Sequence, residues 1–412
     1  MNRRLGWRSF ALALSLVTIA FLTLWPSNEK KLPVLLTCLL CGERGSADFL
    51  RNILLFVPFG MALGWGPMPL RKIVVAGALL TASVEVAQLF IPGRDSSLSD
   101  VVSNTLGTFL GAITARRAAL IAHGEHVRRP GLVTAALALL PVAITAIVGV
   151  LLQPTFPRST YFGEWTPVYE GVPHYTGQIQ DARLGALPLP SEQLANPGEV
   201  RALLAQETPL RVRLRAGPAP RGLAPLFGIV DEEQREIALF GISYDDLVYR
   251  YYMRATAWRF EQPSLRLSRA LQAVRPGDTV VVSHWTTATG HCLQVRNRQA
   301  CGLGWTAGSG WTLLLYPGWF PARVLRSIGL CWIGALFLPL GLWVRRRLIV
   351  WSVGTGSATL GVMPWLTHLK PTTGGEWVAA VAGVCGGVIV RQILERRRGP
   401  SRPPAGAFQP TG

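Results

Sequence analysis

Seven polar side chains lie within or beside apolar segments near the N-terminal end of the chain. They are Asn52, Glu85, Gln88, Arg94, Asp95, Asp100 and Asn104. A carboxylate at the centre of a bilayer costs about 2.5 kcal/mol or more, so such a group tends to have a specific role. Acids and amides at this depth can bind a polar or cationic group at the level of the lipid headgroups, or they can bond to each other and hold helices together. The sequence leaves both interpretations open.

The spacing of these residues places them on shared helix faces. Asp100 and Asn104 are four residues apart, and Glu85 and Gln88 are three apart, so each pair lies on one side of a helix. Small residues and a proline on the same segments are expected to let neighbouring helices approach closely. These packing positions are Pro58, Gly60, Gly107 and Gly111.

The segments that carry these residues are expected to cross a membrane. Of the 412 residues, 49% are hydrophobic and only 16% are charged, and the mean hydropathy is +0.30. A spanning helix needs about 20 mostly apolar residues. Eight such stretches are present, at 7–25, 48–65, 72–91, 100–115, 131–152, 322–344, 348–366 and 377–394. The fold class expected is therefore a mixed one, an α-helical multi-pass membrane bundle with a β-rich insert.

The net charge of +18 is concentrated at the ends of these stretches. With eight crossings, every basic cluster falls on one side, which the positive-inside rule makes cytoplasmic. Both termini are then cytoplasmic, and the long segment after the fifth span is extracytoplasmic, in a bacterial inner membrane. Because the charges follow the helix ends, we expect no nucleic-acid partner.

This orientation brings the polar residues to one level. At 1.5 Å per residue, Asn52 and Asn104 lie about 6 Å below the outer ends of their spans, Glu85 about 9 Å and Gln88 about 4.5 Å. Three helices thus present polar groups in the outer third of the bilayer. This level is open to the exterior.

Residues 7–115 resemble the VanZ-like family of bacterial membrane proteins. The similarity rests on Asn52-Ile-Leu-Leu-Phe56-Val-Pro58-Phe-Gly60, Ser83-x-Glu85-x-x-Gln88, Pro92-Gly-Arg94-Asp95, Asp100, and Asn104-Thr-x-Gly107-x-x-x-Gly111. The resemblance implies a multi-pass protein of the cell envelope, and some family members are linked to resistance against glycopeptide antibiotics. Family members often carry a further acid where this chain has Ser97, which disfavours a metal site built from several carboxylates. The resemblance implies no established reaction.

Residues 153–320 have a different pattern. Short runs such as Leu210-Arg-Val-Arg-Leu214 alternate apolar and polar residues and recur about every ten residues between turns, which predicts an antiparallel β-sandwich. The order of its segments loosely resembles concanavalin A/laminin-G-like sandwiches, which implies a glycan as one candidate partner. Its tryptophans, Trp258, Trp285, Trp305 and Trp311, fit either a core or a sugar platform, and its acids Asp231, Asp245 and Asp246 fit either solvated turns or a calcium site.

Two pairs of cysteines fall on the extracytoplasmic side, where disulfides form. If residues 295–298 make a two-residue hairpin turn, Cys292 and Cys301 lie opposite each other, so we predict a disulfide between them. Cys38 and Cys41 fit a small loop disulfide, a redox pair or half of a metal site.

The domain organisation follows from these patterns. We expect a VanZ-like membrane domain of four spans at 1–118, a basic cytoplasmic loop at 119–130, a fifth span at 131–152, the β-sandwich at 153–320, three further spans at 321–396, and a basic disordered tail at 397–412.

No catalytic set stands out, so the interpretation leans away from an enzyme and includes no cofactor or metal. The leading hypothesis is an envelope protein whose outer-leaflet residues contact membrane lipids or a cell-wall precursor, with an influence on glycopeptide susceptibility. The alternatives are a proton-coupled carrier of small solutes or lipids, in which Glu85 changes its protonation state, and a scaffold that displays the sandwich.

Overall fold

The computed structural model describes residues 2–26, 39–40, 42–94, 96–123, 130–169, 171–316 and 322–396. Three of the residues singled out by the sequence, Cys38, Cys41 and Asp95, lie outside the described residues. The interpretations placed on them therefore stay predictions.

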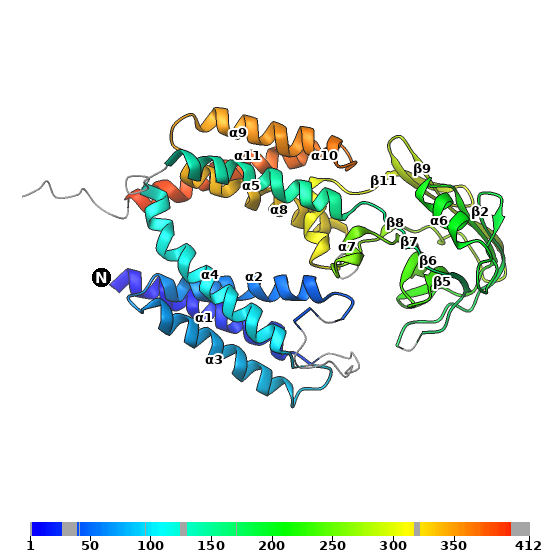
Figure 1. Cartoon of the computed structure of the whole chain (residues 1–412), viewed down its shortest axis with the longest axis horizontal. Helices are drawn as coiled ribbons and strands as arrows, with labels where there is room; N and C mark the ends of the chain where they lie inside the picture. The colour runs from blue at the N-terminus through cyan, green and yellow to red at the C-terminus, as the bar shows by residue number, and fades with distance from the viewer. Residues whose placement is uncertain are drawn as a thin grey trace, which may run out of the picture.

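The first four helices form one group (Figure 1). They are α1 (Asn2–Leu24), α2 (Gly45–Gly64), α3 (Leu70–Gln88) and α4 (Leu98–His123). Buried Ile19, Phe56, Phe59 and Val84 bring α1, α2 and α3 into one apolar cluster. The residues between α2 and α3 include Pro67 and Pro69, which fix the backbone in non-helical conformations and so separate the two helices.

A second group of helices lies beside the first (Figure 1). It contains α5 (Pro130–Leu151), α8 (Ala322–Trp343), α9 (Leu348–Gly356), a π-helical segment η3 (Ser357–Val362), α10 (Met363–Leu366) and α11 (Gly374–Arg396). Glycines allow α8 and α11 to touch, because a Cβ atom on Gly341 would lie 1.9 Å from the Val384 carbonyl oxygen. Backbone contact of this kind is typical of helices that pack in a membrane.

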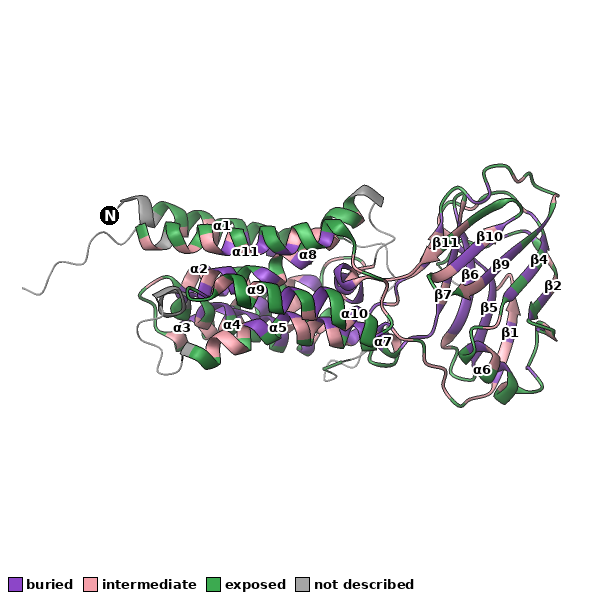
Figure 2. Ribbon diagram, turned by 90° about the horizontal axis from the view of Figure 1, so that it is seen from above, coloured by how far each residue is buried: buried purple, intermediate pink, exposed green. Residues whose placement is uncertain are grey.

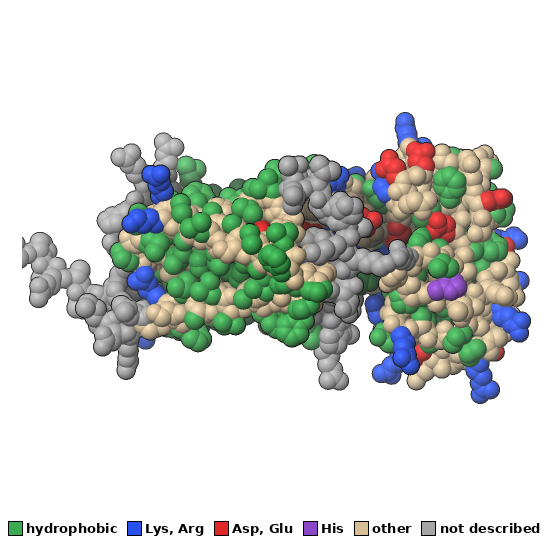
Figure 3. All heavy atoms as spheres, turned by 90° about the horizontal axis from the view of Figure 1, so that it is seen from below, with side chains coloured by type: hydrophobic (Ala, Val, Ile, Leu, Met, Phe, Trp, Pro, Cys, Tyr) green, Lys and Arg blue, Asp and Glu red, His purple; other side chains and the backbone are tan. Residues whose placement is uncertain are grey.

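Five of the described helices are long and apolar enough to cross a bilayer. They cover Gly6–Leu24, Gly45–Gly64, Gly131–Leu151, Val324–Trp343 and Gly374–Ile393. Hydrophobic side chains cover the surface of the helical region, and Lys and Arg side chains gather at its end away from the sheets (Figure 3). The chain therefore has the character of a membrane protein. The remaining three spans expected from the sequence correspond to α3, α4 and the α9–α10 helix, and their crossing stays a prediction.

Two antiparallel sheets lie at the other end of the molecule, between α5 and α8 in the chain (Figures 1 and 2). The five-stranded sheet has the order β1-β5-β6-β7-β8 and the six-stranded sheet the order β11-β10-β9-β4-β2-β3. The strands are β1 (Tyr161–Trp165), β2 (Gln178–Leu184), β3 (Leu187–Pro188), β4 (Leu210–Arg215), β5 (Leu223–Asp231), β6 (Glu236–Ser243), β7 (Asp246–Tyr251), β8 (Leu265–Leu267), β9 (Thr279–Thr287), β10 (Gly290–Val295) and β11 (Arg298–Leu303).

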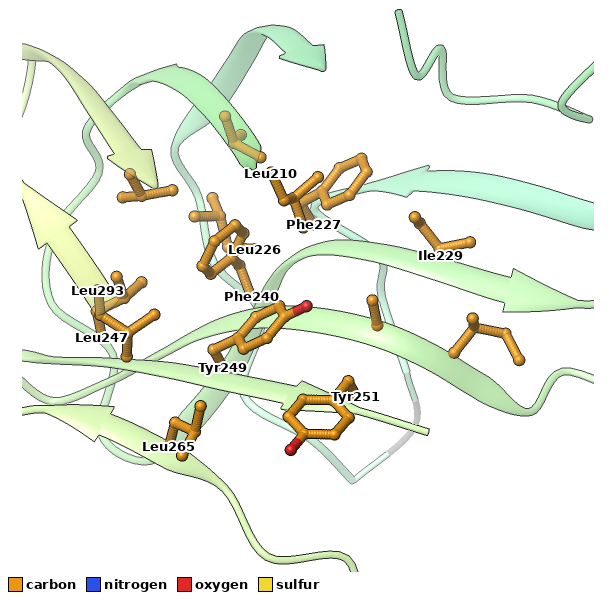
Figure 4. Close-up of a cluster of buried hydrophobic side chains, with 14 of the residues drawn as sticks. Leu210, Leu226, Phe227, Ile229, Phe240, Leu247, Tyr249, Tyr251, Leu265 and Leu293 are labelled. Atoms are coloured by element: carbon orange, nitrogen blue, oxygen red, sulfur yellow. The ribbon is translucent and has the colours of Figure 1, made fainter. Parts of the chain in front are cut away.

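The two sheets share one hydrophobic core (Figure 4). The alternation expected for residues 210–214 is present, because Leu210, Val212 and Leu214 are fully buried while the arginines between them are exposed. Phe227 and Phe240 of the five-stranded sheet belong to the same cluster. Two sheets that bury one core between them form a sandwich, as the sequence predicts.

Two short elements lie between the sandwich and the helices, α7 (Arg254–Ala257) and the 3-10 helix η1 (Ala307–Leu313), whereas α6 (Pro197–Ala205) packs against β2 within the sandwich. At η1, the buried Glu376 of α11 accepts hydrogen bonds from the backbone of Gly308 (2.7 Å) and of Thr373 (2.7 Å). Thr373 and Glu376 form a capping box at the start of α11. The Glu376 carboxylate therefore caps its own helix and also binds the backbone of η1, which follows the last strand of the sandwich.

Candidate functional site

The polar residues of α2, α3 and α4 converge in the structure. On α3, Thr81, Glu85 and Gln88 lie on one buried face, with exposed fractions of 0%, 6% and 5%. On α4, Asn104 is 2% exposed and donates from Nδ2 to the Thr81 hydroxyl at 2.9 Å. The i, i+4 and i+7 spacing on α3 is what points these side chains at the neighbouring helix.

Asp100 is the half-buried acid of this cluster. Its Oδ1 atom accepts a hydrogen bond of 2.7 Å from Asn52 Nδ2, which joins the N-terminal parts of α4 and α2. The carboxylates of Glu85 and Asp48 repel its charge, and Arg51 attracts it. Among the described residues, the carboxylates of Asp48, Glu85 and Asp100 therefore lie close enough to repel one another, and Arg51 offsets part of this charge.

Glu85 is held by backbone at the start of the next helix. Its Oε2 atom accepts a hydrogen bond of 2.7 Å from the Ser97 amide, just before α4 begins. A carboxylate that accepts from an amide at a helix N-terminus also gains from the helix dipole. Glu85 is thus positioned by the α3–α4 connection.

Two amide oxygens in the cluster have no hydrogen-bond partner within the described part of the chain. They are Gln88 Oε1 and Asn104 Oδ1, and both are buried. The Gln88 Nε2 atom donates to the Thr23 carbonyl at 2.9 Å, which fixes the orientation of the amide. These two oxygens can therefore still accept hydrogen bonds. A buried polar atom without a partner costs about 1 to 3 kcal/mol, so a donor that meets it gains that energy.

Arg94 contacts the end of α1. Its Nε atom donates to the Trp25 carbonyl and its Nη2 atom to the Leu22 carbonyl, both at 2.8 Å. These are the last carbonyls of α1, which lack partners inside the helix. Arg94 positions α1 against the α3–α4 connection.

Glycines bring α2 and α4 into backbone contact below this cluster. A Cβ atom on Gly60 would lie 2.1 Å from the Thr108 carbonyl oxygen, and one on Gly107 would lie 2.3 Å from that of Ile53. On Gly111 it would lie 2.1 Å from the Val57 carbonyl oxygen. Pro58 has an exposed side chain on α2. The three glycines set the distance between the two helices that carry Asn52 and Asp100.

A buried acid that sequence reasoning missed links the sandwich to this cluster. Glu261, which follows α7, is 1% exposed and pairs with Arg44 (3.2 Å) and Arg51 (3.6 Å) at the start of α2. The Arg259 carbonyl accepts hydrogen bonds from the Ser46 and Ala47 amides at 3.1 and 3.3 Å. Burial raises the pKa of Glu261, against the attraction of both arginines. The only signal in the sequence was Arg51, a charge at the start of an apolar span.

This helical region has relatives. Residues 7–121 match the VanZ/LLP1 family model. The resemblance seen in the sequence is therefore confirmed over the region that forms α1 to α4, the VanZ-like domain. No curated protein and no solved structure matches the chain. The likeness of the sandwich to concanavalin A/laminin-G-like folds stays a prediction, with which its two antiparallel sheets are consistent.

The remaining candidates lie in the sandwich. Cys292 and Cys301 form a disulfide with 4.1 Å between their Cα atoms. Trp258 is 68% exposed, while Trp311 is buried in η1 and Trp305 packs against the hydrophobic core, so these three do not form one exposed platform. Asp231 is fully buried and binds Arg235 in the β5–β6 turn. No group of three or more metal-ligating side chains is found among the described residues.

A buried histidine pair predicts a pH dependence of stability. His284 Nε2 lies 3.1 Å from His291 Nδ1, and the Tyr251 hydroxyl lies 3.2 Å from His291 Nε2. Burial lowers the pKa of His284 to about 3 and that of His291 to about 4. Since the unfolded chain binds these protons below pH 6.5 and the folded chain does not, the stabilisation is complete above that pH and is lost as the pH falls toward 4. At pH 5 we expect a loss of about 2 kcal/mol after allowing for partial solvent screening.

The measurement is urea unfolding of the full chain at pH 7 and pH 5, followed by tryptophan fluorescence. The double variant His284→Phe/His291→Phe should reduce the difference between the two pH values. His174→Phe, which changes an exposed histidine, should keep it. An unchanged difference in the double variant would rule out the buried pair as its source.

Proposed function

We propose that the protein is a bacterial cell-envelope membrane protein whose VanZ-like domain binds a headgroup that donates hydrogen bonds. The observation that carries this proposal is the presence of buried hydrogen-bond acceptors without partners beside several carboxylates. Within the described residues, the buried side-chain oxygens of Gln88 and Asn104 have no partners, and Asp48, Glu85 and Asp100 add negative charge beside them. An ammonium or hydroxyl group supplies what these atoms lack.

The proposal includes the orientation expected from the sequence. Eight helices cross the inner membrane, the basic helix ends and both termini face the cytoplasm, and the sandwich lies outside. In that frame the outer ends of α2, α3 and α4 reach the headgroups of the outer leaflet. The natural ligand is then a membrane lipid or a lipid-linked cell-wall precursor, and binding it would alter susceptibility to glycopeptide antibiotics that act on such precursors.

The test compares two lipids that differ in their donors. Phosphatidylethanolamine has N–H donors, whereas phosphatidylcholine carries the same charge without them. We expect the full chain, reconstituted in nanodiscs containing both lipids, to retain phosphatidylethanolamine selectively when analysed by native mass spectrometry. The variant Asp100→Asn should reduce this retention about tenfold, because it removes a charge-assisted hydrogen bond.

Glu199→Gln is the matched control, because it removes one negative charge from an exposed site on α6. It should leave lipid retention unchanged. Equal retention of both lipids, or full retention by Asp100→Asn, would contradict the headgroup site and leave interhelical packing as the role of the cluster. Proton-coupled uptake into vesicles that depends on Glu85 would instead favour the carrier.

A further inference from the structure

The outer face of the six-stranded sheet carries a groove of about 980 Å³. The strand register defines its floor. Arg183 of β2 pairs with Arg211 of β4, Arg211 pairs with Ser283 of β9, and Ser283 pairs with Gln294 of β10. One row across four strands therefore presents two arginines, a hydroxyl and an amide to the outside. Arg213 lies two residues along β4, in the next row on the same face.

The groove has more positive charge than its own acids can balance. Arg183 pairs with Asp181 at 2.9 Å, and Arg296 pairs with Asp278 at 2.9 Å. Arg211 and Arg213 are exposed and form no ion pair in the part of the chain that the structure describes, although Asp181 of β2 is the cross-strand neighbour of Arg213. Like charges directly opposite each other on neighbouring strands destabilise a sheet. Such a cost is compensated when an anion binds across the row.

The groove also offers a flat apolar surface. Trp285 of β9 lies along its wall, half-buried, on the same face as Ser283 and Val281. An indole face can pack against the apolar face of a sugar ring, while hydroxyl and amide side chains bond to sugar hydroxyls. Arginine suits carboxylate and phosphate groups because its planar donors bind two oxygens at once.

We propose that this groove binds an anionic glycan of the cell envelope, with its carboxylate or phosphate groups on Arg211 and Arg213 and a sugar ring against Trp285. This groove is separate from the polar residues of α2, α3 and α4, and the proposal does not depend on the headgroup site proposed there. The volume lies at the upper end of that usual for ligand sites, about 300 to 1,000 Å³.

The place of the groove favours an envelope polymer over a lipid of the surrounding bilayer. Strand β2, which forms one wall, lies at the side of the sandwich away from the helices in both views (Figures 1 and 2). Several Lys and Arg side chains also project from that end of the molecule (Figure 3). A bilayer around the helices therefore does not reach Arg211 and Arg213.

The test measures binding of fluorescent oligogalacturonate, phosphorylated dextran and neutral dextran of equal length to the full chain in detergent, by fluorescence anisotropy. At least one anionic glycan should bind more tightly than neutral dextran, with an affinity that falls as salt rises. Arg211→Gln/Arg213→Gln should weaken it about tenfold or more. Trp285→Ala should weaken glycan binding several-fold and leave binding of inorganic polyphosphate unchanged.

Arg221→Gln/Arg254→Gln is the matched control, because it removes the same charge from exposed sites outside the groove. An equal loss of glycan affinity in this control would show that net charge alone causes the effect and would overturn the proposal. Failure of both anionic glycans to exceed neutral dextran would overturn it as well. If polyphosphate binds and Trp285→Ala leaves glycan binding unchanged, the groove does not bind a sugar ring. If phosphatidylglycerol nanodiscs bind as tightly as the anionic glycans, the ligand of the groove is a lipid.

Discussion

Replacing Gly107 and Gly111 together with alanine is expected to separate α2 from α4 and lower the stability of the VanZ-like domain by about 4 kcal/mol. Each new Cβ atom would lie 2.1 to 2.3 Å from a carbonyl oxygen of α2, at Ile53 or Val57. Backbone cannot rotate away as a side chain can, so the helices must move apart. Asn52 and Asp100 would then lose their hydrogen bond. The measurement is thermal unfolding of the full chain in nanodiscs, with the lipid retention described above as a second readout.

Gly386→Ala is the control for this substitution. Gly386 lies in α11 with nothing within 4 Å of the position its Cβ would take. Alanine is the better helix former by about 1 kcal/mol, so this variant should be slightly more stable than the natural chain. If Gly107→Ala/Gly111→Ala were also more stable, the close contact of α2 and α4 would be refuted.

Replacing Glu261 with alanine is expected to release the sandwich from the VanZ-like domain at a cost of about 2 kcal/mol, because it removes the buried carboxylate that pairs with Arg44 and Arg51. Arg44 and Arg51 both pair with this carboxylate, and Arg51 also binds Asp48, which lies beside Asp100. Hydrogen exchange should therefore increase at the amides of Ser46 and Ala47, which donate to Arg259.

Glu261→Gln should cost less than Glu261→Ala, because burial already disfavours the charged form of Glu261, whose pKa is raised. Glu233→Gln is the control, since Glu233 is 64% exposed in its ion pair with Arg235 and such surface pairs contribute about 0 to 1 kcal/mol. Unchanged exchange at residues 46–47 in Glu261→Ala would show that the two regions are held together without this ion pair.

Local patterns in the sequence predicted much of the fold. Apolar stretches of membrane length predicted the helices, because the bilayer requires about 20 apolar residues for each crossing. The alternation in Leu210-Arg-Val-Arg-Leu214 predicted a strand with one buried face, which β4 has. The conspicuous motifs around Asn52, Glu85 and Asn104 were sufficient to identify the VanZ-like family. These features depend only on residues that are close together in the sequence, so they can be recognised without the tertiary structure.

The partners of individual side chains could not be predicted in this way. Nothing in the residues around Glu261 indicates that it meets Arg44 and Arg51, more than 200 positions earlier in the chain. The residues around Arg94 likewise do not indicate that it binds the carbonyls at the end of α1. Which acceptor a long side chain reaches depends on where the helices lie, and that follows from the packing of the whole group.

The sequence by itself determined that this chain has membrane-length helices, a VanZ-like region with polar residues on shared helix faces, and a sheet-rich segment, because periodicity and composition are local properties. Only the tertiary structure decided that the unpaired groups of the cluster are acceptors, that Glu261 joins the sandwich to α2, and that arginines from β2 and β4 form one row. Hydrogen bonds and ion pairs act over a few ångströms in space. Their outcome depends on which distant segments the fold brings into contact.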